Sequence, residues 1–247
     1  MSGHSKWAGI KHKKAVVDAR KGQTFTKVGN EITVAARESG GDPTSNFRLR
    51  LAVQKAREVN MPADNIERAI KRGTGELQGE AIEEIRYEGF GPGGVAILVD
   101  VLSDNRNRTV ASIRNLFTRA GGSLGESNSV GWMFRRTGLI RVDPGRSEPE
   151  ELALQAIELG ADDVQVEDGS LELLVAPERL EQLRQALAEA GLEVRSAEVT
   201  MDPTNTVDVD SKNAPAVIHL LEALEEHDDV REVHCNANLP DDVLAEV

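Results

Sequence analysis

The chain contains few of the residues on which several classes of protein depend. It has one cysteine, Cys235, so it cannot form an internal disulfide and offers too few thiolates for a zinc site. No stretch approaches eighteen consecutive apolar residues, so no membrane-spanning helix is expected. The first residues, Met-Ser-Gly-His-Ser-Lys-Trp, contain neither the apolar core of a secretory signal nor the Arg/Ser-rich stretch of a transit peptide. We therefore expect a cytoplasmic protein with no membrane partner.

Motifs for catalysis and cofactor binding are also lacking. The five histidines do not follow a metal-ligand spacing such as His-Glu-x-x-His, and no Gly-x-Ser-x-Gly nucleophile motif occurs. Residues 89–94 match Gly-x-Gly-x-x-Gly, but a β-type run follows them in place of the helix whose N-terminus would receive a pyrophosphate. These residues instead predict a hairpin or tight turn. The sequence thus indicates a protein that is not an enzyme and has no cofactor or metal site.

The length and composition of the chain are typical of a globular protein of two or three domains. It has 247 residues, of which 39% are hydrophobic and 29% are charged. The first 75 residues carry helical patterns. A lysine-rich helix is expected over residues 9–17, and three helices with apolar stripes are expected over about residues 25–39, 46–59 and 62–73.

Beyond a polar linker near residues 76–80, strand patterns alternate with helical ones. Strands are expected at 95–102 and 129–134, on either side of a helix at 106–120. The series 138–142, 149–159, 164–167, 171–175, 177–190 and 192–199 has the βαββαβ order of a ferredoxin-like domain. A strand, helix and strand at 206–209, 213–227 and 230–235 supply half of another such unit.

These patterns predict an α+β fold, with an N-terminal all-α helical domain followed by two ferredoxin-like α/β domains. The helical domain covers residues 1–78. The middle domain is discontinuous, over residues 79–134 plus 203–247, and the last domain, residues 135–202, is inserted into it.

Charge is divided unequally along the chain. Residues 1–75 contain 15 Lys and Arg against 7 Asp and Glu, a net +8; the whole-chain totals of 29 and 42 leave 14 against 35, a net −21, for the rest. A basic region joined to acidic ones is expected when one domain docks on a polyanion. Neutralisation of the basic part by the acidic part within the molecule is the alternative explanation.

The basic charges lie on helical faces that leave the apolar stripes intact. Lys11 and Lys14 are one turn apart, and Arg50 and Arg57 are two turns apart, so such charges can meet successive phosphates or form an ordinary solvated surface. The ring of Trp7 can stack on an unpaired base or anchor a small core. The predicted nucleic-acid-binding residues are Lys6, Trp7, Lys11, His12, Lys13, Lys14, Arg20, Lys21, Lys27, Arg48, Arg50, Lys55, Arg68, Lys71 and Arg72.

Several motifs resemble a known family in order and spacing. The basic part carries Gly-His-Ser-Lys-Trp-Ala-Gly-Ile-Lys-His-Lys-Lys at residues 3–14, Gly-Gly-Asp-Pro at 40–43 and Asn-Ile-Glu-Arg-Ala-Ile-Lys-Arg-Gly-Thr-Gly at 65–75. Tyr-Glu-Gly-Phe-Gly-Pro-Gly-Gly follows at 87–94, Asp-Asn-Arg-Asn-Arg-Thr at 104–109, and a segment from Gly125-Glu126 to Trp132-Met133-Phe134. Together they resemble the YebC/PmpR family over nearly the whole chain.

The resemblance implies three domains, helical first and then two α/β domains, and a role in gene expression. Members of that family are described as probable DNA-binding transcriptional regulators, and relatives, including a mitochondrial translational activator, act in translation at the ribosome. We therefore expect a DNA-binding transcriptional regulator whose basic helices contact phosphates. The alternative is a ribosome-associated translation factor that binds ribosomal RNA, which the lack of an identifiable base-reading helix favours.

Overall fold

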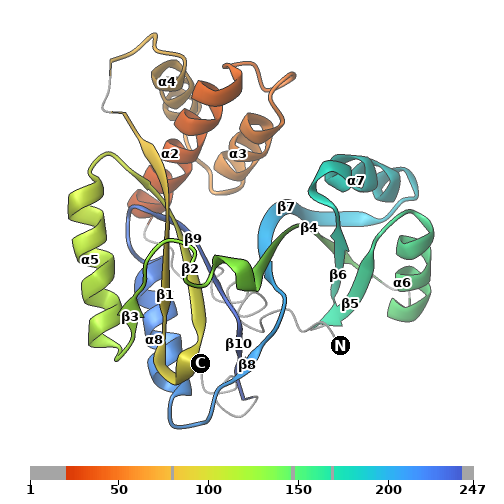
Figure 1. Cartoon of the computed structure of the whole chain (residues 1–247). Helices are drawn as coiled ribbons and strands as arrows, with labels where there is room; N and C mark the ends of the chain where they lie inside the picture. The colour runs from red at the N-terminus through yellow and green to blue at the C-terminus, as the bar shows by residue number, and fades with distance from the viewer. Residues whose placement is uncertain (1–20, 79–80, 146–147, 168–169, 241–247) are drawn as a thin grey trace. The chain divides into compact units, whose positions relative to one another are not determined.

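The computed structural model of the chain describes residues 21–78, 81–145, 148–167 and 170–240 (Figure 1). These residues divide into two compact units: residues 133–205 form one, and residues 21–132 together with 206–240 form the other. Helices come first and antiparallel sheets follow, so the fold is α+β, as predicted. Within the described ranges no helix is long and apolar enough to cross a membrane.

Three helices begin the larger unit, in agreement with the apolar stripes: α2 (Lys21–Ser39), α3 (Phe47–Glu58) and α4 (Ala63–Gly73). Their stripes meet in one apolar core in which Ile32, Leu49 and Ala56 are fully buried. The helix predicted over residues 9–17 lies outside the described residues.

Asn46 fixes the turn between α2 and α3. Its side-chain oxygen accepts the Leu49 N–H at 3.0 Å, which caps α3, while its amide nitrogen donates to the carbonyls of Ala35 and Gly40 at 2.8 Å each. The side chain is 2% exposed, so these bonds satisfy polar groups that water does not reach.

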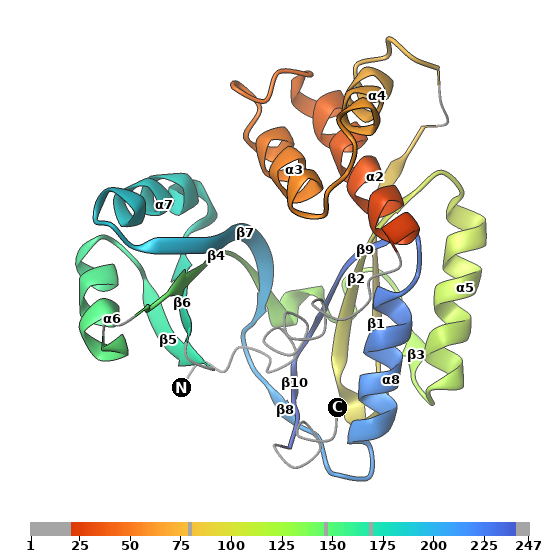
Figure 2. The same ribbon diagram turned by 180° about the vertical axis from the view of Figure 1, so that it is seen from behind.

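A four-stranded antiparallel sheet, in the order β3-β1-β2-β9, forms the rest of the larger unit with helices α5 and α8 on one face (Figures 1 and 2). The central strand β2 is buried at every position, and its apolar residues Val99 and Val101 pack with Phe117 and Leu221 of the two helices. The bounds are β1 (Glu83–Phe90), β2 (Ala96–Ser103), α5 (Arg106–Arg119), β3 (Ser123–Leu124), α8 (Ala214–Glu225) and β9 (Val230–Cys235), with a short parallel pair β8 (Val207–Asp208) and β10 (Ala237–Asn238).

Strand β1 was not predicted from the sequence. It pairs with β2 over its whole length, from Glu83 opposite Ser103 to Phe90 opposite Ala96, but its three glutamates weaken the local β signal. The 89–94 segment is confirmed as a hairpin, closed by η1 (Pro92–Gly94), because β1 and β2 are antiparallel. The sheet therefore begins with two strands, β1 and β2, before helix α5. The prediction that it begins with one strand at residue 95, followed directly by a helix, is wrong.

The strand predicted over residues 129–134 is also wrong. That segment forms a bend and the 3₁₀ helix η2 (Gly131–Met133), and the strand that pairs with the other edge of β1 is β3. The reason is a side chain: the carboxylate of Glu88 accepts the N–H groups of Asn128, Val130 and Gly131 that a strand would give to a neighbour.

The smaller unit has the element order strand, helix, strand, strand, helix, strand. Its sheet runs β5-β6-β4-β7 and is antiparallel throughout. Leu173 and Ile140 of the central strands are fully buried, as are Leu180 and Leu187 of the second helix. The elements are β4 (Phe134–Asp143), α6 (Pro149–Glu158), β5 (Asp163–Glu167), β6 (Ser170–Val175), η3 (Pro177–Arg179), α7 (Leu180–Glu189) and β7 (Glu193–Pro203).

Candidate nucleic-acid interface

Helix α2 lies on the face of the larger sheet opposite α5 and α8. Val34 of α2 packs with Ile82 and Leu102 in a small apolar cluster. Arg37 donates to the carbonyl of Ile82 at 2.6 Å, and the Lys27 amine donates to the carbonyl of Glu225 at the end of α8. Two basic residues of α2 therefore attach the helical segment to the rest of the larger unit, one at the residue before β1 and one at the end of α8.

Arg48 of α3 is held by three carboxylates, two from α2 and one from β1. Its guanidinium lies 2.9 Å from Glu31, 2.8 Å from Glu38 and 3.1 Å from Glu84. Burial acts to lower the pKa of Arg48, but the ion pairs with Glu31 and Glu84 outweigh burial and raise it. The positive charge of Arg48 is therefore compensated within the chain.

A second cluster of charges lies on the same face of the sheet, around Asp100. Arg86 donates to both of its oxygens, at 2.6 and 3.0 Å, and Arg231 donates to Oδ2 at 3.1 Å. Burial acts to raise the pKa of Asp100, but the interactions with His234, Arg86 and Arg231 hold it well below its usual range. Arg231 also lies 3.7 Å from Glu31 of α2, which joins this cluster to the helical segment.

Within the described part of the chain, Asp100, Glu232 and His234 bring possible metal ligands within 4.8 Å of one another. The Nε2 atom of His234 lies 3.4 Å from Asp100 and 3.8 Å from Glu232. Two guanidiniums already bind the carboxylate of Asp100, and their positive charge would repel a cation. We therefore interpret these residues as part of an ion network that holds α2 on the sheet.

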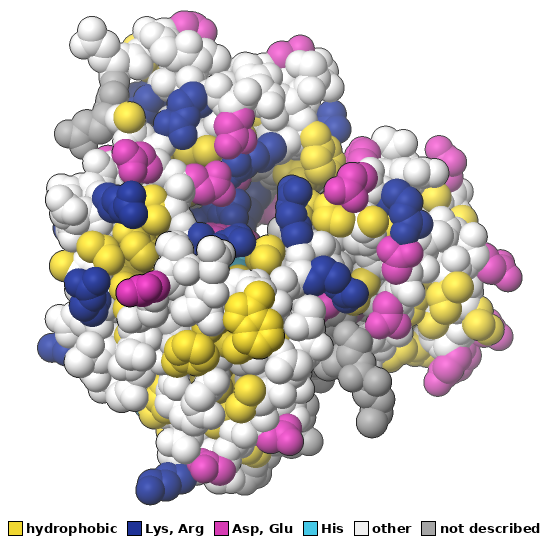
Figure 3. Space-filling view, in the orientation of Figure 1, with side chains coloured by type: hydrophobic (Ala, Val, Ile, Leu, Met, Phe, Trp, Pro, Cys, Tyr) yellow, Lys and Arg dark blue, Asp and Glu magenta, His cyan; other side chains and the backbone are white. Residues whose placement is uncertain are grey.

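Figure 3 shows Lys and Arg side chains gathered where the helical segment meets the sheet. Acidic side chains lie beside them, in agreement with the carboxylates that surround Arg48 and Asp100. Much of the positive charge on this face is thus already paired.

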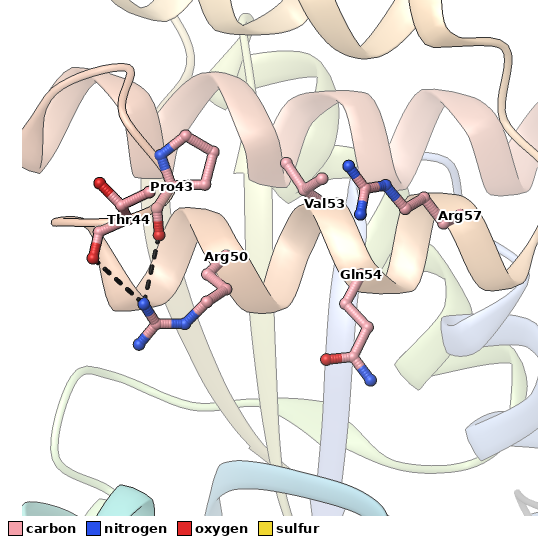
Figure 4. Close-up of a pocket in the computed structure, with 6 residues that line it drawn as sticks. All are labelled: Pro43, Thr44, Arg50, Val53, Gln54 and Arg57. Carbon is pink, nitrogen blue, oxygen red and sulfur yellow. Dashed lines mark hydrogen bonds between the residues drawn. The ribbon is translucent and has the colours of Figure 1, made fainter.

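The other arginines of α3 have different surroundings. Arg50 donates to the carbonyls of Pro43 and Thr44, at 3.3 and 3.2 Å, and its guanidinium lies 5.4 Å from the centre of the Phe47 ring. It borders a groove of about 570 Å³ that is also lined by Val53, Gln54 and Arg57 (Figure 4). Arg50 and Gln54 extend to one side of α3, and Arg57 lies near Val53 on the other, so both basic and apolar side chains line the groove.

Helix α4 presents further basic groups to solvent. Arg68 and Arg72 are exposed and form no ion pair with a described residue, and Lys55 of α3 is exposed in the same way. Lys71 pairs with Glu67 one turn earlier at 2.6 Å, and this ion pair raises the pKa of Lys71. Arg68, Arg72 and Lys55 are therefore better placed to receive a phosphate than Lys71.

The structure leaves several predicted contacts untested. Lys21 is the first residue of α2, and its side chain is not described. The other predicted contacts of the N-terminus lie outside the described residues: Lys6, Trp7, Lys11, His12, Lys13, Lys14 and Arg20. Arg57 lines the groove beside Arg50. Its two-turn spacing from Arg50 was noted in the sequence, but the set of predicted binding residues did not include it.

A histidine and a serine meet at another point of the larger unit, but not as a nucleophile and its base. Nδ1 of His227 accepts the N–H of Asp229 at 3.1 Å, so Nε2 carries the proton and donates to the Ser112 hydroxyl at 2.9 Å. Burial lowers the pKa of His227, although Asp229 and Asp228 act to raise it. A histidine that donates to a hydroxyl does not remove its proton, so Ser112 is not activated.

Fold and charge together define an α+β protein with a basic helical segment joined to acidic α/β units. A family model described as the TACO1/YebC protein N-terminal domain matches residues 5–76, and one described as the TACO1/YebC second and third domain matches residues 82–237. The chain belongs to the TACO1/YebC family, which confirms the resemblance of its motifs.

Relatives with closely similar sequences carry the name "Probable transcriptional regulatory protein". One from Natranaerobius thermophilus is 53% identical over 247 residues, 99% of each chain, and one from Moorella thermoacetica is 54% identical over 243 residues, 97% of this chain and 96% of that one. A crystal structure of a conserved hypothetical protein from Aquifex aeolicus has a TM-score of 0.87 at 47% identity, and covers 96% of this chain and 98% of its own.

Proposed function

We propose that this protein is a DNA-binding transcriptional regulator of the cytoplasm, not an enzyme, and that its basic N-terminal helices contact phosphates. The observation that carries the proposal is the net charge of +8 in residues 1–75, against −21 in the rest. The name shared by the relatives supports a regulatory role. The proposed regulator has residues 1–78 as its binding domain, 79–134 plus 203–247 as its middle domain and 135–202 as an inserted domain.

The surroundings of the predicted phosphate ligands divide them into two groups. Lys27 and Arg48 are bound to groups within the chain, so a phosphate would have to displace those groups. Lys55, Arg68 and Arg72 are exposed and form no ion pair with a described residue, so a phosphate adds a favourable interaction without breaking one. We expect the second group, with the lysines of residues 6–21, to provide most of the affinity.

The salt dependence of DNA binding tests this proposal. Replacing Lys11, Lys13 and Lys14 together by alanine should reduce the log-log slope of affinity against salt by roughly 0.9 for each duplex phosphate that these lysines neutralise in the wild type. The measurement is a titration of duplex DNA by fluorescence anisotropy at several salt concentrations.

A matched control removes the same charge elsewhere. Arg106, Arg114 and Arg119 are exposed on α5, so their triple alanine variant also loses three positive charges but should keep the slope of the wild type. Equal slopes for the wild type and the triple-lysine variant would contradict the proposed role of these lysines.

A second candidate function is ribosome-associated translation, with ribosomal RNA as the ligand. The groove on α3 favours it, because a groove lined by both basic and apolar side chains suits an irregular or unpaired strand better than a regular duplex. Ultraviolet crosslinking in cells, followed by sequencing of the captured nucleic acid, separates the two functions. Promoter DNA would support the first, and ribosomal RNA would support the second.

A further inference from the structure

The loop that follows β3 is held in one conformation by a buried carboxylate. Glu88 is 6% exposed and accepts the N–H groups of Asn128 and Val130 at 2.8 Å and of Gly131 at 2.6 Å. The Gly125 N–H donates to the backbone carbonyl of the same glutamate at 2.8 Å. Asn128 has a φ of +66°, a left-handed conformation, and Val130 is completely buried. The loop is therefore ordered before any ligand arrives.

This loop presents Trp132 to solvent. The side chain is 69% exposed, the largest fraction among the exposed large hydrophobic side chains of the described residues. Its indole N–H donates to the Ser129 carbonyl at 3.3 Å within the same loop. The hydrogen-bonding group of the indole is thus already used, and the ring surface is what remains for a ligand.

The rest of the loop distinguishes between two kinds of ligand. Its other exposed side chains are those of Glu126, Ser127 and Asn128, which are polar. A protein-docking surface normally has several apolar neighbours around a buried aromatic anchor, whereas a base needs one ring to stack on. A single exposed ring on a fixed loop whose other exposed side chains are polar therefore favours a planar ligand.

We propose that Trp132 is a stacking platform for an unpaired nucleobase. The inference rests on the proposed nucleic-acid binding and adds a second contact to it, since Trp132 belongs to the same compact unit as α2, α3 and α4. The basic helices supply affinity for phosphates on any strand, and the ring adds affinity for strands with an unstacked base. Binding to unpaired strands should therefore depend on Trp132, and binding to a regular duplex should not.

Fluorescence reports on this contact directly. The chain has two tryptophans, Trp7 and Trp132, so Trp7→Phe leaves Trp132 as the only tryptophan emitter and keeps an aromatic ring at position 7. Quenching is read at probe concentrations at which anisotropy shows that this variant is bound. Oligouridylate and oligothymidylate are the probes, and their two arms distinguish RNA from DNA. We expect either or both to quench the emission of Trp132, and a duplex of the same length to leave it nearly unchanged.

Affinity is then compared between Trp132→Leu and Trp132→Phe, both with Trp7 intact. Stacking on one base accounts for about a fivefold or greater change in affinity, so the leucine variant should bind the single strands at least about fivefold more weakly. The phenylalanine variant keeps a ring and should retain most of the affinity. Both should bind the duplex as the wild type does.

The outcomes separate this inference from the function on which it rests. Wild-type affinity for single strands in Trp132→Leu, together with unquenched emission, would overturn the inference while leaving nucleic-acid binding in place. A wild-type protein that binds neither strand nor duplex would overturn both. Loss of duplex and single-strand binding together in Trp132→Leu would show a general structural defect and would also overturn the inference.

Discussion

Two helical glycines in the larger unit should respond to the same substitution in opposite directions. Gly73 ends α4 against α2, and a Cβ added there would lie 2.3 Å from the Thr33 carbonyl oxygen and 2.7 Å from the Cβ of Ala36. Gly29 lies inside α2, and a Cβ added there would meet no atom within 4 Å. Neither glycine has a positive φ, so alanine can adopt both backbone conformations.

Two effects set the expected change in the free energy of unfolding. Alanine is more favourable than glycine in a helix by about 0.5–1 kcal/mol, so Gly29→Ala should stabilise the protein by about that amount. At Gly73 the added methyl group must push α4 away from the backbone of α2, and such overpacking costs about 1–3 kcal/mol. After the smaller gain in helix propensity is subtracted, Gly73→Ala should destabilise the unit by about 1–2 kcal/mol.

Urea unfolding followed by circular dichroism measures both changes. Because the two compact units can unfold separately, hydrogen exchange of the α2 amides identifies the transition to which each change belongs. A Gly73→Ala protein as stable as the wild type, beside a stabilised Gly29→Ala protein, would refute the close approach of α2 and α4.

Two further predictions concern buried polar groups. The carboxylate of Asp100 has a depressed pKa in the folded state, so its contribution to stability is present above its ordinary pKa near 3.8 and is lost as the pH falls through and below that value. Asp100→Asn should remove this part of the acid dependence. Because Arg86 and Arg231 lose their partner, it should also lower the free energy of unfolding at neutral pH by about 2–3 kcal/mol. If the dependence of stability on pH between about pH 5 and 2 were the same in this variant as in the wild type, the ion network would be contradicted. Asn46→Ala removes a helix cap, the buried hydrogen bond to the Ala35 carbonyl and the part-buried one to the Gly40 carbonyl, so urea unfolding should show a loss of about 2–4 kcal/mol. Asn46→Ser keeps an uncharged cap acceptor and should lose less.

The elements that the sequence predicted well are those whose pattern is local. Helices α2, α3 and α4 and the six elements of the smaller unit follow apolar periodicities of a few residues, and their observed bounds differ from the predicted ones by a few residues. Strand β1 and the loop after β3 escaped prediction because distant partners determine them. Pairing with β2 makes the glutamate-rich segment 83–90 a strand. Hydrogen bonds to the Glu88 carboxylate keep the segment 129–133 out of a sheet, although it is rich in apolar residues.

The sequence by itself determined the division of charge, the helical faces that carry the basic residues, and membership of the family. Only the tertiary structure decided which of those residues remain available to a ligand. Arg48 and Lys55 are two turns apart on α3 and looked equivalent in the sequence. Arg48 meets carboxylates of Glu31, Glu38 and Glu84, whereas Lys55 is exposed and forms no ion pair with a described residue. The physical reason is that a charge is compensated by whatever folding brings within a few ångströms of it, and those groups come from segments far along the chain.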